Sequence, residues 1–333
     1  MITDQTDKQP AVTLAVRGKR LLRIAVKLCA LGLIGMFAFS LLARHFFVAE
    51  LLVNFQLQWF ILLSIGTWVT SRLGMTWLTL LQGVAGVWTG VGLAWIYLPA
   101  VQPAGDAETI RIMSFNVYAV SDRVDLVEER ISEVDPDVIA ILEYDHHWHR
   151  RLAGLRETYS HHLLVPRWHG YGLAIFSKLP LEETEIVQLI PEITDTPMAV
   201  GRIRVGKQPL RLAALHSLSP TNSFRFELRN RQFKEVAQTL GRDSVPTIVM
   251  GDFNCTPASP YLRDFMAETG YRDSRQGFGY QPSWHCDIWP LQIPIDHAFV
   301  SPEVSVHRRW VADAAGSDHY PIIVEVSVKP SRQ

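Results

Sequence analysis

One short stretch places a carboxylate and a carboxamide at a spacing that suits chemistry. In VPTIVMGDFNCTP, residues 245–257, Asp252 and Asn254 closely follow five mostly apolar, β-favouring residues. They are therefore expected at the end of a buried strand. Gly, Asp and Asn are also common turn residues, so a plain turn is the alternative. The chemical interpretation is a site for a hard cation and a phosphate group.

Other polar residues stand at the ends of further predicted strands. Strands are expected over 110–115, 137–142, 172–177, 209–217, 246–250, 295–301 and 319–328, and amphipathic helices over 123–134 and between 226 and 240. Antiparallel neighbours bring the start of one strand beside the end of another, so these polar groups can meet on one rim of a sheet sandwich. The candidates are Asn116, Glu143, His216, Asp252, Asn254, Asp296, Asp318 and His319. Such oxygen-rich clusters favour Mg²⁺, Mn²⁺ or Ca²⁺ over zinc.

Charge is distributed unevenly along the 333 residues. Residues 1–100 contain eight Lys/Arg and three acids, a net +5, and the other 233 residues contain 24 basic and 30 acidic side chains, a net −6. Three cysteines do not form a disulfide framework; Cys255 and Cys286 could pair, but free thiols are preferred. Histidine-rich runs at 145–149 and 161–162 are interpreted as a helix start and a loop rather than a metal site.

The N-terminal region predicts a membrane anchor. Uncharged apolar runs cover 28–43 and 73–100, and a less apolar run with Glu50 covers 46–70. After a basic N-terminus (1–20), a membrane region (21–100) with three transmembrane helices is expected, at roughly 25–44, 56–71 and 73–98. The middle helix has the weakest signal. A cleaved signal peptide over 17–43 is the alternative, disfavoured because FSLLARH lacks a small-residue cleavage site.

The distribution of basic residues predicts the orientation of this anchor. Five basic residues lie at 17–27 and one, Arg44, follows the first predicted helix, so the N-terminus is expected in the cytoplasm. Three spans then place the C-terminal domain outside the cytoplasm, whereas two spans place it inside. The expected location is the bacterial inner membrane, with an extracytoplasmic C-terminal domain.

Seven segments of the C-terminal part together resemble the ordered motifs of the endonuclease/exonuclease/phosphatase superfamily, related to deoxyribonuclease I. They are MSFNVY, AILEYD, GYGLAIFSK, LAALHS, VMGDFNCTP, PIDHAFVS and GSDHYPIIVEV. The resemblance covers 109–328, after a linker at 101–108, and suggests a bacterial-type membrane-anchored member. It implies a four-layer α/β/β/α sandwich with two mixed sheets inside and helices outside.

The resemblance also implies a role for each matching residue. Asn116 and Glu143 would hold Mg²⁺ or Mn²⁺, with Asp318 as a further acid near the metal. Asp252 would orient and deprotonate the attacking water, and Asn254 would hold that water and a phosphate oxygen.

The remaining motif residues would contact the substrate or orient a neighbour. His319, oriented by Asp296, would hydrogen-bond the phosphoryl oxygens. His216 would contact phosphate or protonate the leaving group. Trp284 and Tyr171 are the implied substrate contacts.

The expected function is a membrane-anchored, divalent-metal-dependent phosphodiesterase of nuclease type. Alternatives are a phospholipid or sphingolipid headgroup phosphodiesterase, a phosphomonoesterase and, from another class, a non-catalytic anchored interaction domain. The acidic C-terminal part disfavours extensive nucleic-acid contacts, although Arg167, Lys178, Arg202 and Arg225 could line a groove. Cys255 and Thr256 depart from the Tyr-Arg of inositol polyphosphate phosphatases. Nucleic acid or a lipid headgroup and the lipid bilayer are the expected partners; no obligate protein partner is indicated.

Overall fold

The computed structural model describes residues 9–99, 108–241 and 245–329, and it divides into two compact units, 1–94 and 95–333. Residues 1–8 of the predicted basic N-terminus and 101–107 of the predicted linker lie outside the described residues. Each unit is described by itself.

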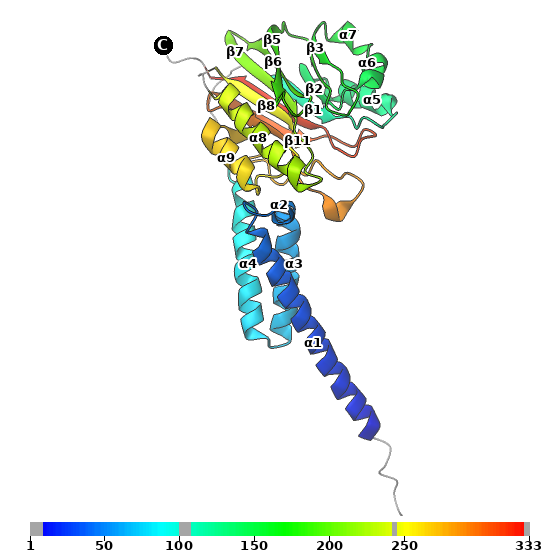
Figure 1. Ribbon diagram of the computed structural model, residues 1–333, viewed down its shortest axis with the longest axis vertical. Coiled ribbons are helices and arrows are strands. Elements are labelled where there is room, and N and C mark those ends of the chain that lie inside the picture. Colours follow the sequence, from blue (N-terminus) through cyan, green and yellow to red (C-terminus); the bar gives the residue numbers. More distant parts are fainter. Residues whose placement is uncertain (1–8, 100–107, 242–244, 330–333) are drawn as a thin grey trace, which may run out of the picture. The chain divides into compact units, whose positions relative to one another are not determined.

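The first unit is helical (Figure 1). It contains α1 (Gln9–Ser40), α2 (Phe47–Val53), α3 (Gln56–Arg72) and α4 (Thr76–Ala94). Arg17–Ser40 and Thr76–Tyr97 are long and apolar enough to cross a membrane. The helices α2 and α3 form a pair bent by 76°, which gives a third candidate if the pair counts as one span. Two helical segments, in α1 and α4, therefore have the length and composition of membrane spans, and a third crossing by α3 stays a prediction.

Helix α1 packs against α3 in the opposite direction. Near the middle of α1, Arg23 donates a hydrogen bond to the Leu73 carbonyl just after α3 (2.6 Å). Near its end, Phe37 meets Trp59 of the first turn of α3 edge to face, with ring centroids 5.9 Å apart. Moving forward along α1, the contacts move backward along α3, as expected for two antiparallel helices.

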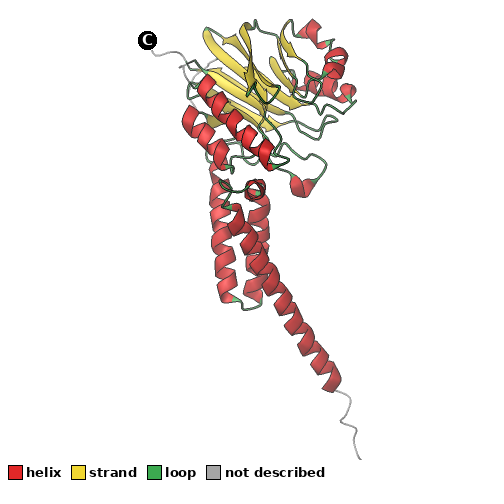
Figure 2. Cartoon of the chain, in the orientation of Figure 1, coloured by secondary structure: helices red, strands yellow, loops and turns green. Residues whose placement is uncertain are grey.

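The second unit contains two six-stranded sheets (Figure 2). Sheet A has the order β11-β12-β1-β2-β4-β3 and sheet B the order β5-β6-β7-β8-β10-β9. Each contains one parallel pair, β1–β2 or β7–β8, and antiparallel neighbours elsewhere, so both sheets are mixed. The strands of sheet A are β1 (Ile110–Asn116), β2 (Val138–Leu142), β3 (His161–Val165), β4 (Leu173–Ser177), β11 (Val304–Val311) and β12 (Ile322–Val328). Those of sheet B are β5 (Glu182–Leu189), β6 (Thr196–Val205), β7 (Gln208–His216), β8 (Thr247–Asp252), β9 (Arg272–Asp273) and β10 (Asp296–Val300).

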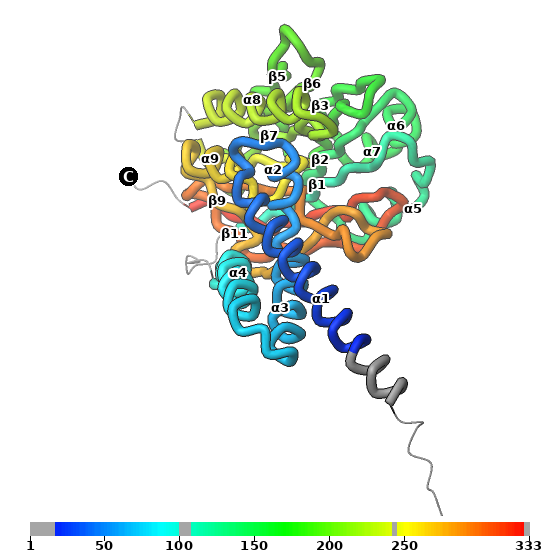
Figure 3. Tube along the Cα trace, turned by 60° about the horizontal axis from the view of Figure 1, so that its bottom comes forward, coloured from blue at the N-terminus to red at the C-terminus, as the bar shows by residue number. Residues whose placement is uncertain are grey.

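Helices cover the outer face of each sheet. On sheet A lie α5 (Val124–Val134), α6 (His146–Arg151) and α7 (Leu155–Thr158); on sheet B lie α8 (Ser223–Leu240) and α9 (Pro260–Thr269). The two groups lie on different sides of the unit in Figure 3. One apolar core fills the space between the sheets, and two others lie beneath the helices. Short 3₁₀ turns at Trp95–Tyr97 (η1) and Trp289–Leu291 (η2) complete the elements. The predicted four-layer sandwich is confirmed.

Two local predictions were wrong. His161 and His162 begin strand β3 rather than lying in a loop, because they pair with Ser177 and Phe176 of β4. The last strand begins at Ile322 rather than residue 319, because Ser317 to Tyr320 form a turn in which the Ser317 hydroxyl accepts a hydrogen bond from the His319 amide.

Candidate active site

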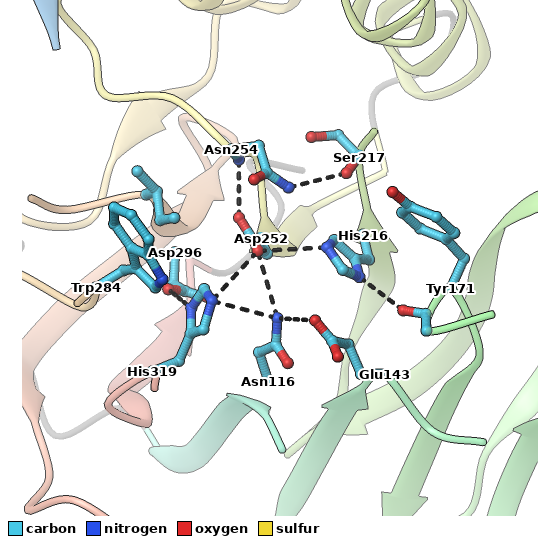
Figure 4. A network of polar contacts seen from close by, with 12 residues as sticks. Asn116, Glu143, Tyr171, His216, Ser217, Asp252, Asn254, Trp284, Asp296 and His319 are labelled. Carbon is cyan, nitrogen blue, oxygen red and sulfur yellow. Dashed lines mark hydrogen bonds and ion pairs between the residues drawn. The ribbon is translucent and has the colours of Figure 1, made fainter. Parts of the chain in front are cut away.

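Strand register brings the predicted polar residues to one rim. In the parallel pair β1–β2, Asn116 lies opposite Leu142, one residue before Glu143. In the parallel pair β7–β8, His216 lies opposite Asp252, and the antiparallel pair β8–β10 places Asp296 opposite that same Asp252. Both sheets therefore end their central strands at the same rim, where Figure 4 shows a connected network of polar contacts.

Asn116 and Glu143 form a fixed pair. The Asn116 Nδ2 donates to Glu143 Oε1 at 3.0 Å, and the Asn116 Oδ1 accepts from the Tyr118 amide at 3.0 Å. The other Glu143 oxygen accepts from the Ala119 amide at 2.7 Å. Backbone donors from the loop after β1 thus hold both side chains in place, and Asn116 is buried.

Asp252 lies at the centre of the network and is 2% exposed. One of its oxygens accepts from the Asn254 amide at 2.8 Å. Its Oδ2 faces the Nε2 atoms of His216 at 3.4 Å and of His319 at 3.7 Å. Burial raises the pKa of Asp252, but the His216 hydrogen bond and the His319 charge outweigh it, so the pKa lies below its usual value. The carboxylate is therefore ionised at neutral pH.

His319 is held by Asp296. Its Nδ1 lies 2.8 Å from Asp296 Oδ2, and the Asp296 amide donates to the Ser283 hydroxyl at 2.9 Å. Burial lowers the pKa of His319, but the Asp296 charge and hydrogen bond outweigh it and raise the pKa to about 10. The ring is therefore an imidazolium at neutral pH, with its Nε2 directed toward Asp252 and Asn116 (Figure 4).

His216 has an orienting partner that no side-chain pattern indicates. Its Nδ1 lies 3.1 Å from the Gly170 carbonyl, in the loop before β4. A carbonyl accepts only, so this contact places a proton on Nδ1. Burial lowers the pKa of His216, but the hydrogen bond and charge of Asp252 raise it more.

The GDFN corner is both a turn and part of the network. The hydrogen bond from the Asn254 amide to the Asp252 side chain forms an Asx turn. The turn that the sequence offered as the alternative interpretation is therefore present together with the polar network. Asn254 has a positive φ of 51°, its Nδ2 donates to the Ser217 carbonyl at 2.9 Å, and its carbonyl accepts from Arg229 at 3.1 Å. Arg229 is fully buried in α8, and the motif residues alone do not reveal it.

The glycine of this corner is required by close packing. Gly251 has φ 141°, and a Cβ there would lie 1.9 Å from the Leu215 carbonyl oxygen. Gly172 of the GYG segment is similar, since a Cβ there would lie 2.0 Å from the Tyr144 carbonyl oxygen. Only glycine allows these backbones to approach so closely.

Asp318, Trp284 and Tyr171 lie at the margins. The Trp284 indole donates to Asp318 Oδ2 at 3.0 Å, and the other Asp318 oxygen is buried with no hydrogen-bond donor among the described residues. The Tyr171 ring lies 4.9 Å from the His216 ring, and its hydroxyl accepts from Arg225. Trp284 and Tyr171 therefore lie at opposite ends of the network (Figure 4).

Two sets of side chains could hold a metal. Asp252, Asp296 and His319 offer ligand atoms within 4.8 Å of one another. The Asp296–His319 hydrogen bond, however, already occupies one donor atom of each residue. Asn116, Glu143 and Asp318 offer oxygens, which suit a hard cation. Those of Asn116 and Glu143 already accept hydrogen bonds, whereas the buried Asp318 Oδ1 has no donor among the described residues.

A further group of possible metal ligands includes one cysteine. His285, Cys286 and Asp287 are close enough to share an ion. Burial raises the pKa of the Cys286 thiol to about 11, and its Sγ donates to the Ser317 carbonyl. Cys255 and Cys286 are both free thiols, as predicted.

Two mixed sheets flanked by helices, with acids, amides and histidines on one rim, define the deoxyribonuclease I-like class of proteins. The chain belongs to the Endonuclease/Exonuclease/phosphatase family, whose sequence profile matches residues 113–319. No match is found among curated proteins.

Solved structures share this fold at low identity. A D. rerio TDP2 humanized by 14 mutations is 18% identical, with a TM-score of 0.56 over 67% of this chain and 100% of that chain. The human Nocturnin catalytic domain with bound sulfate anion is 18% identical, with a TM-score of 0.56 over 69% of this chain and 100% of that chain. An endonuclease/exonuclease/phosphatase from Beutenbergia cavernae DSM 12333 is 18% identical, with a TM-score of 0.53 over 67% of this chain and 72% of that chain.

Proposed function

We propose that this protein is a membrane-anchored, divalent-metal-dependent hydrolase of phosphodiesters. The observation that carries the proposal is the central carboxylate: Asp252 is buried and ionised, and one of its oxygens faces both His216 and His319. An ionised carboxylate beside an imidazolium can take a proton from water while the imidazolium stabilises the negative charge that develops on phosphate.

Each residue has a part in this reaction. Asp252 accepts the proton of the attacking water, and Asn254 positions that water beside it. His319, kept protonated by Asp296, donates an Nε2–H hydrogen bond to a phosphoryl oxygen. His216, whose pKa is raised by Asp252, gives a proton to the leaving oxygen as its bond to phosphorus breaks. Asn116, Glu143 and Asp318 would hold Mg²⁺ or Mn²⁺, which when bound neutralises charge on the phosphate oxygens.

The loops around the rim favour a lipid headgroup over nucleic acid as the substrate. Exposed apolar side chains stand in the same loops that supply the site, and Trp168 and Trp289 are 77% and 74% exposed. The others are Tyr118, Val120 and Ile288, and Phe224 lies nearby in the chain, in the first turn of α8. Aromatic and aliphatic side chains at a rim suit the interfacial region of a bilayer.

The four cations that were expected to line a nucleic-acid groove already have partners. Arg167 pairs with Asp195 at 3.0 Å, and Lys178 and Arg202 pair with Asp135 and Glu183. Arg225 donates to the Ser219 carbonyl and to the Tyr171 hydroxyl. Nucleic-acid affinity depends on cations that neutralise phosphates, so a nuclease-type substrate is the second candidate.

The test is turnover by the full-length protein in detergent with Mg²⁺ or Mn²⁺. Sphingomyelin and phospholipid vesicles, single-stranded DNA, RNA, a chromogenic phosphodiester and inositol phosphates are offered in parallel. Hydrolysis of headgroups that a chelator and Asp252→Ala both abolish supports the proposal. Hydrolysis of DNA or RNA alone would instead select the nuclease-type substrate. No turnover and no metal binding would leave a non-catalytic anchored domain.

For the anchor, we propose three crossings of a bacterial inner membrane with the N-terminus in the cytoplasm. The antiparallel contacts of α1 with α3, at Arg23–Leu73 and at Phe37–Trp59, support a crossing by α3. The catalytic domain over 109–328 then lies outside the cytoplasm.

A further inference from the structure

A groove in the helical unit carries four cations that the proposed catalysis does not use. Lys19, Arg20, Arg23 and Lys27 of α1 line it together with Ile24 and with Met75 of the turn between α3 and α4, and its volume is about 410 Å³. Residues three, four and eight positions apart share one face of a helix, so the four cations form a stripe facing that turn.

The groove is built by a contact between distant parts of the chain. Arg23 donates to the Leu73 carbonyl at 2.6 Å, which closes α1 onto the turn after α3. Arg72, which precedes Leu73 in the chain, is exposed.

The described part of this unit offers these cations almost no countercharge. Glu50 is the single carboxylate between residues 9 and 94, and it lies in α2, which follows the far end of α1. Like charges gathered on one stripe repel one another, so an external anion would stabilise the groove.

The other face of α1 indicates that the anion belongs to a lipid layer. Leu21, Leu22 and Leu28 are 67%, 58% and 64% exposed, as expected for side chains in contact with lipid. Lys19 and Lys27 are separated by about 12 Å along the helix axis at 1.5 Å per residue. A stripe of cations at the N-terminal end of the apolar part of α1 is expected at the headgroup layer.

We propose that this groove binds the phosphate-bearing headgroup of an anionic phospholipid. The guanidinium and ammonium groups contact the phosphate, and Ile24 and Met75 contact the upper part of the acyl chains. A lipid fits better than free phosphate because the groove combines cations with apolar side chains. The inference is independent of the catalytic proposal.

The experiment is native mass spectrometry of the full-length protein released from detergent, titrated with phosphatidylglycerol or phosphatidylcholine. The wild type is expected to retain phosphatidylglycerol with a preference of about tenfold. The variant Lys19→Gln/Arg20→Gln keeps the Arg23–Leu73 hydrogen bond, so it is expected to fold normally and to lose about fivefold in phosphatidylglycerol affinity alone.

A matched control removes two exposed cations elsewhere. Arg204→Gln/Lys207→Gln makes the same charge change on β6 and the turn after it, and should leave lipid retention unchanged. Equal retention of both lipids by the wild type, or undiminished phosphatidylglycerol retention in Lys19→Gln/Arg20→Gln, overturns the proposal. Displacement of the lipid by millimolar inorganic phosphate would show a free-phosphate site and would also overturn it.

Discussion

Asp252 keeps its charge in a place almost closed to water because two histidines face the same carboxylate oxygen. A lone buried carboxylate would take up a proton instead, since burial favours its neutral form. Its ionisation therefore depends on its neighbours, and single substitutions around it should have separable effects.

Replacing Asp252 tests the proton acceptor directly. Asp252→Asn keeps the shape and can still contact the Asn254 amide, but cannot accept a proton, so we expect kcat to fall by about 10³-fold. The measurement is steady-state hydrolysis on vesicles, with circular dichroism to confirm folding. Asp313→Asn, at a carboxylate whose side chain is 93% exposed, is the control and should retain full activity.

Replacing Asp296 tests the origin of the high pKa of His319. Without the carboxylate charge, burial dominates, so Asp296→Asn should bring the pKa of His319 down from about 10. The readout is a ¹⁵N NMR titration of the imidazole in the metal-free protein. We also expect kcat to fall by about 10²-fold with little change in KM. An unchanged titration would contradict the assigned role of Asp296.

Among the elements, the parallel strands β7 and β8 lie so close together at Leu215 and Gly251 that the position in β8 tolerates only glycine. Gly251→Ala would place a Cβ 1.9 Å from the Leu215 carbonyl oxygen. We expect a loss of more than about 4 kcal/mol in unfolding free energy and of all activity. Gly154→Ala, where a Cβ meets nothing within 4 Å, is the matched control. Denaturant midpoints of the two variants measure the difference.

A buried charge cluster beneath the site makes stability depend on pH. His297 in β10 lies 3.9 Å from Asp273 of β9, near Arg275 and Arg309, and its Nε2 contacts the Cys255 carbonyl. Burial is the largest cause that lowers the pKa of His297, from 6.5 to about 3. In the unfolded chain His297 binds a proton below about pH 6.5, whereas in the folded protein it stays neutral down to about pH 3. Its contribution to the unfolding free energy is therefore fully present above pH 6.5 and is lost as the pH falls toward 3.

The expected loss for His297 between pH 7 and pH 5 is about 2 kcal/mol. The pKa of Asp273 is lowered to about 2, so its own contribution changes only at more acidic pH. Denaturant unfolding at both pH values measures the loss. His297→Gln should flatten the dependence, whereas His162→Gln, at an exposed histidine, should not. A slope unchanged by His297→Gln would show that another group titrates.

Buried strands could be predicted from the sequence, whereas exposed or very short strands could not. Strands β1, β2, β4, β7 and β8 are mostly apolar runs, and the polar end residues of β1, β7 and β8 mark the rim. The strand β5 reads EETEIVQL and is mostly exposed at a sheet edge, and β9 has two residues, so neither has an apolar pattern to detect. The partner of His216 is the main-chain carbonyl of Gly170, 46 residues away, and no residue type encodes such a contact.

At the scale of the whole molecule, the number of crossings determines the side on which the catalytic domain works. With three crossings, alkaline phosphatase fused after residue 333 should be active, because that reporter folds only outside the cytoplasm. The same reporter fused at Gly74, in the turn after α3, should be inactive. Activity at Gly74 and none at 333 would contradict this topology, because that pattern is expected when only α1 and α4 cross the membrane or when all three helices cross in the reversed orientation.

The order of strands in sheet A also determines when, during synthesis, the candidate site can form. The last strand, β12, lies between β11 and β1, and the turn before it carries His319. Until residues 319–328 have left the ribosome, β1 lacks one neighbour and Asp252 lacks the His319 imidazolium. We therefore expect a nascent chain to be inactive while its first helices enter the bilayer, and the proposed activity to appear only after β12 has paired with β1.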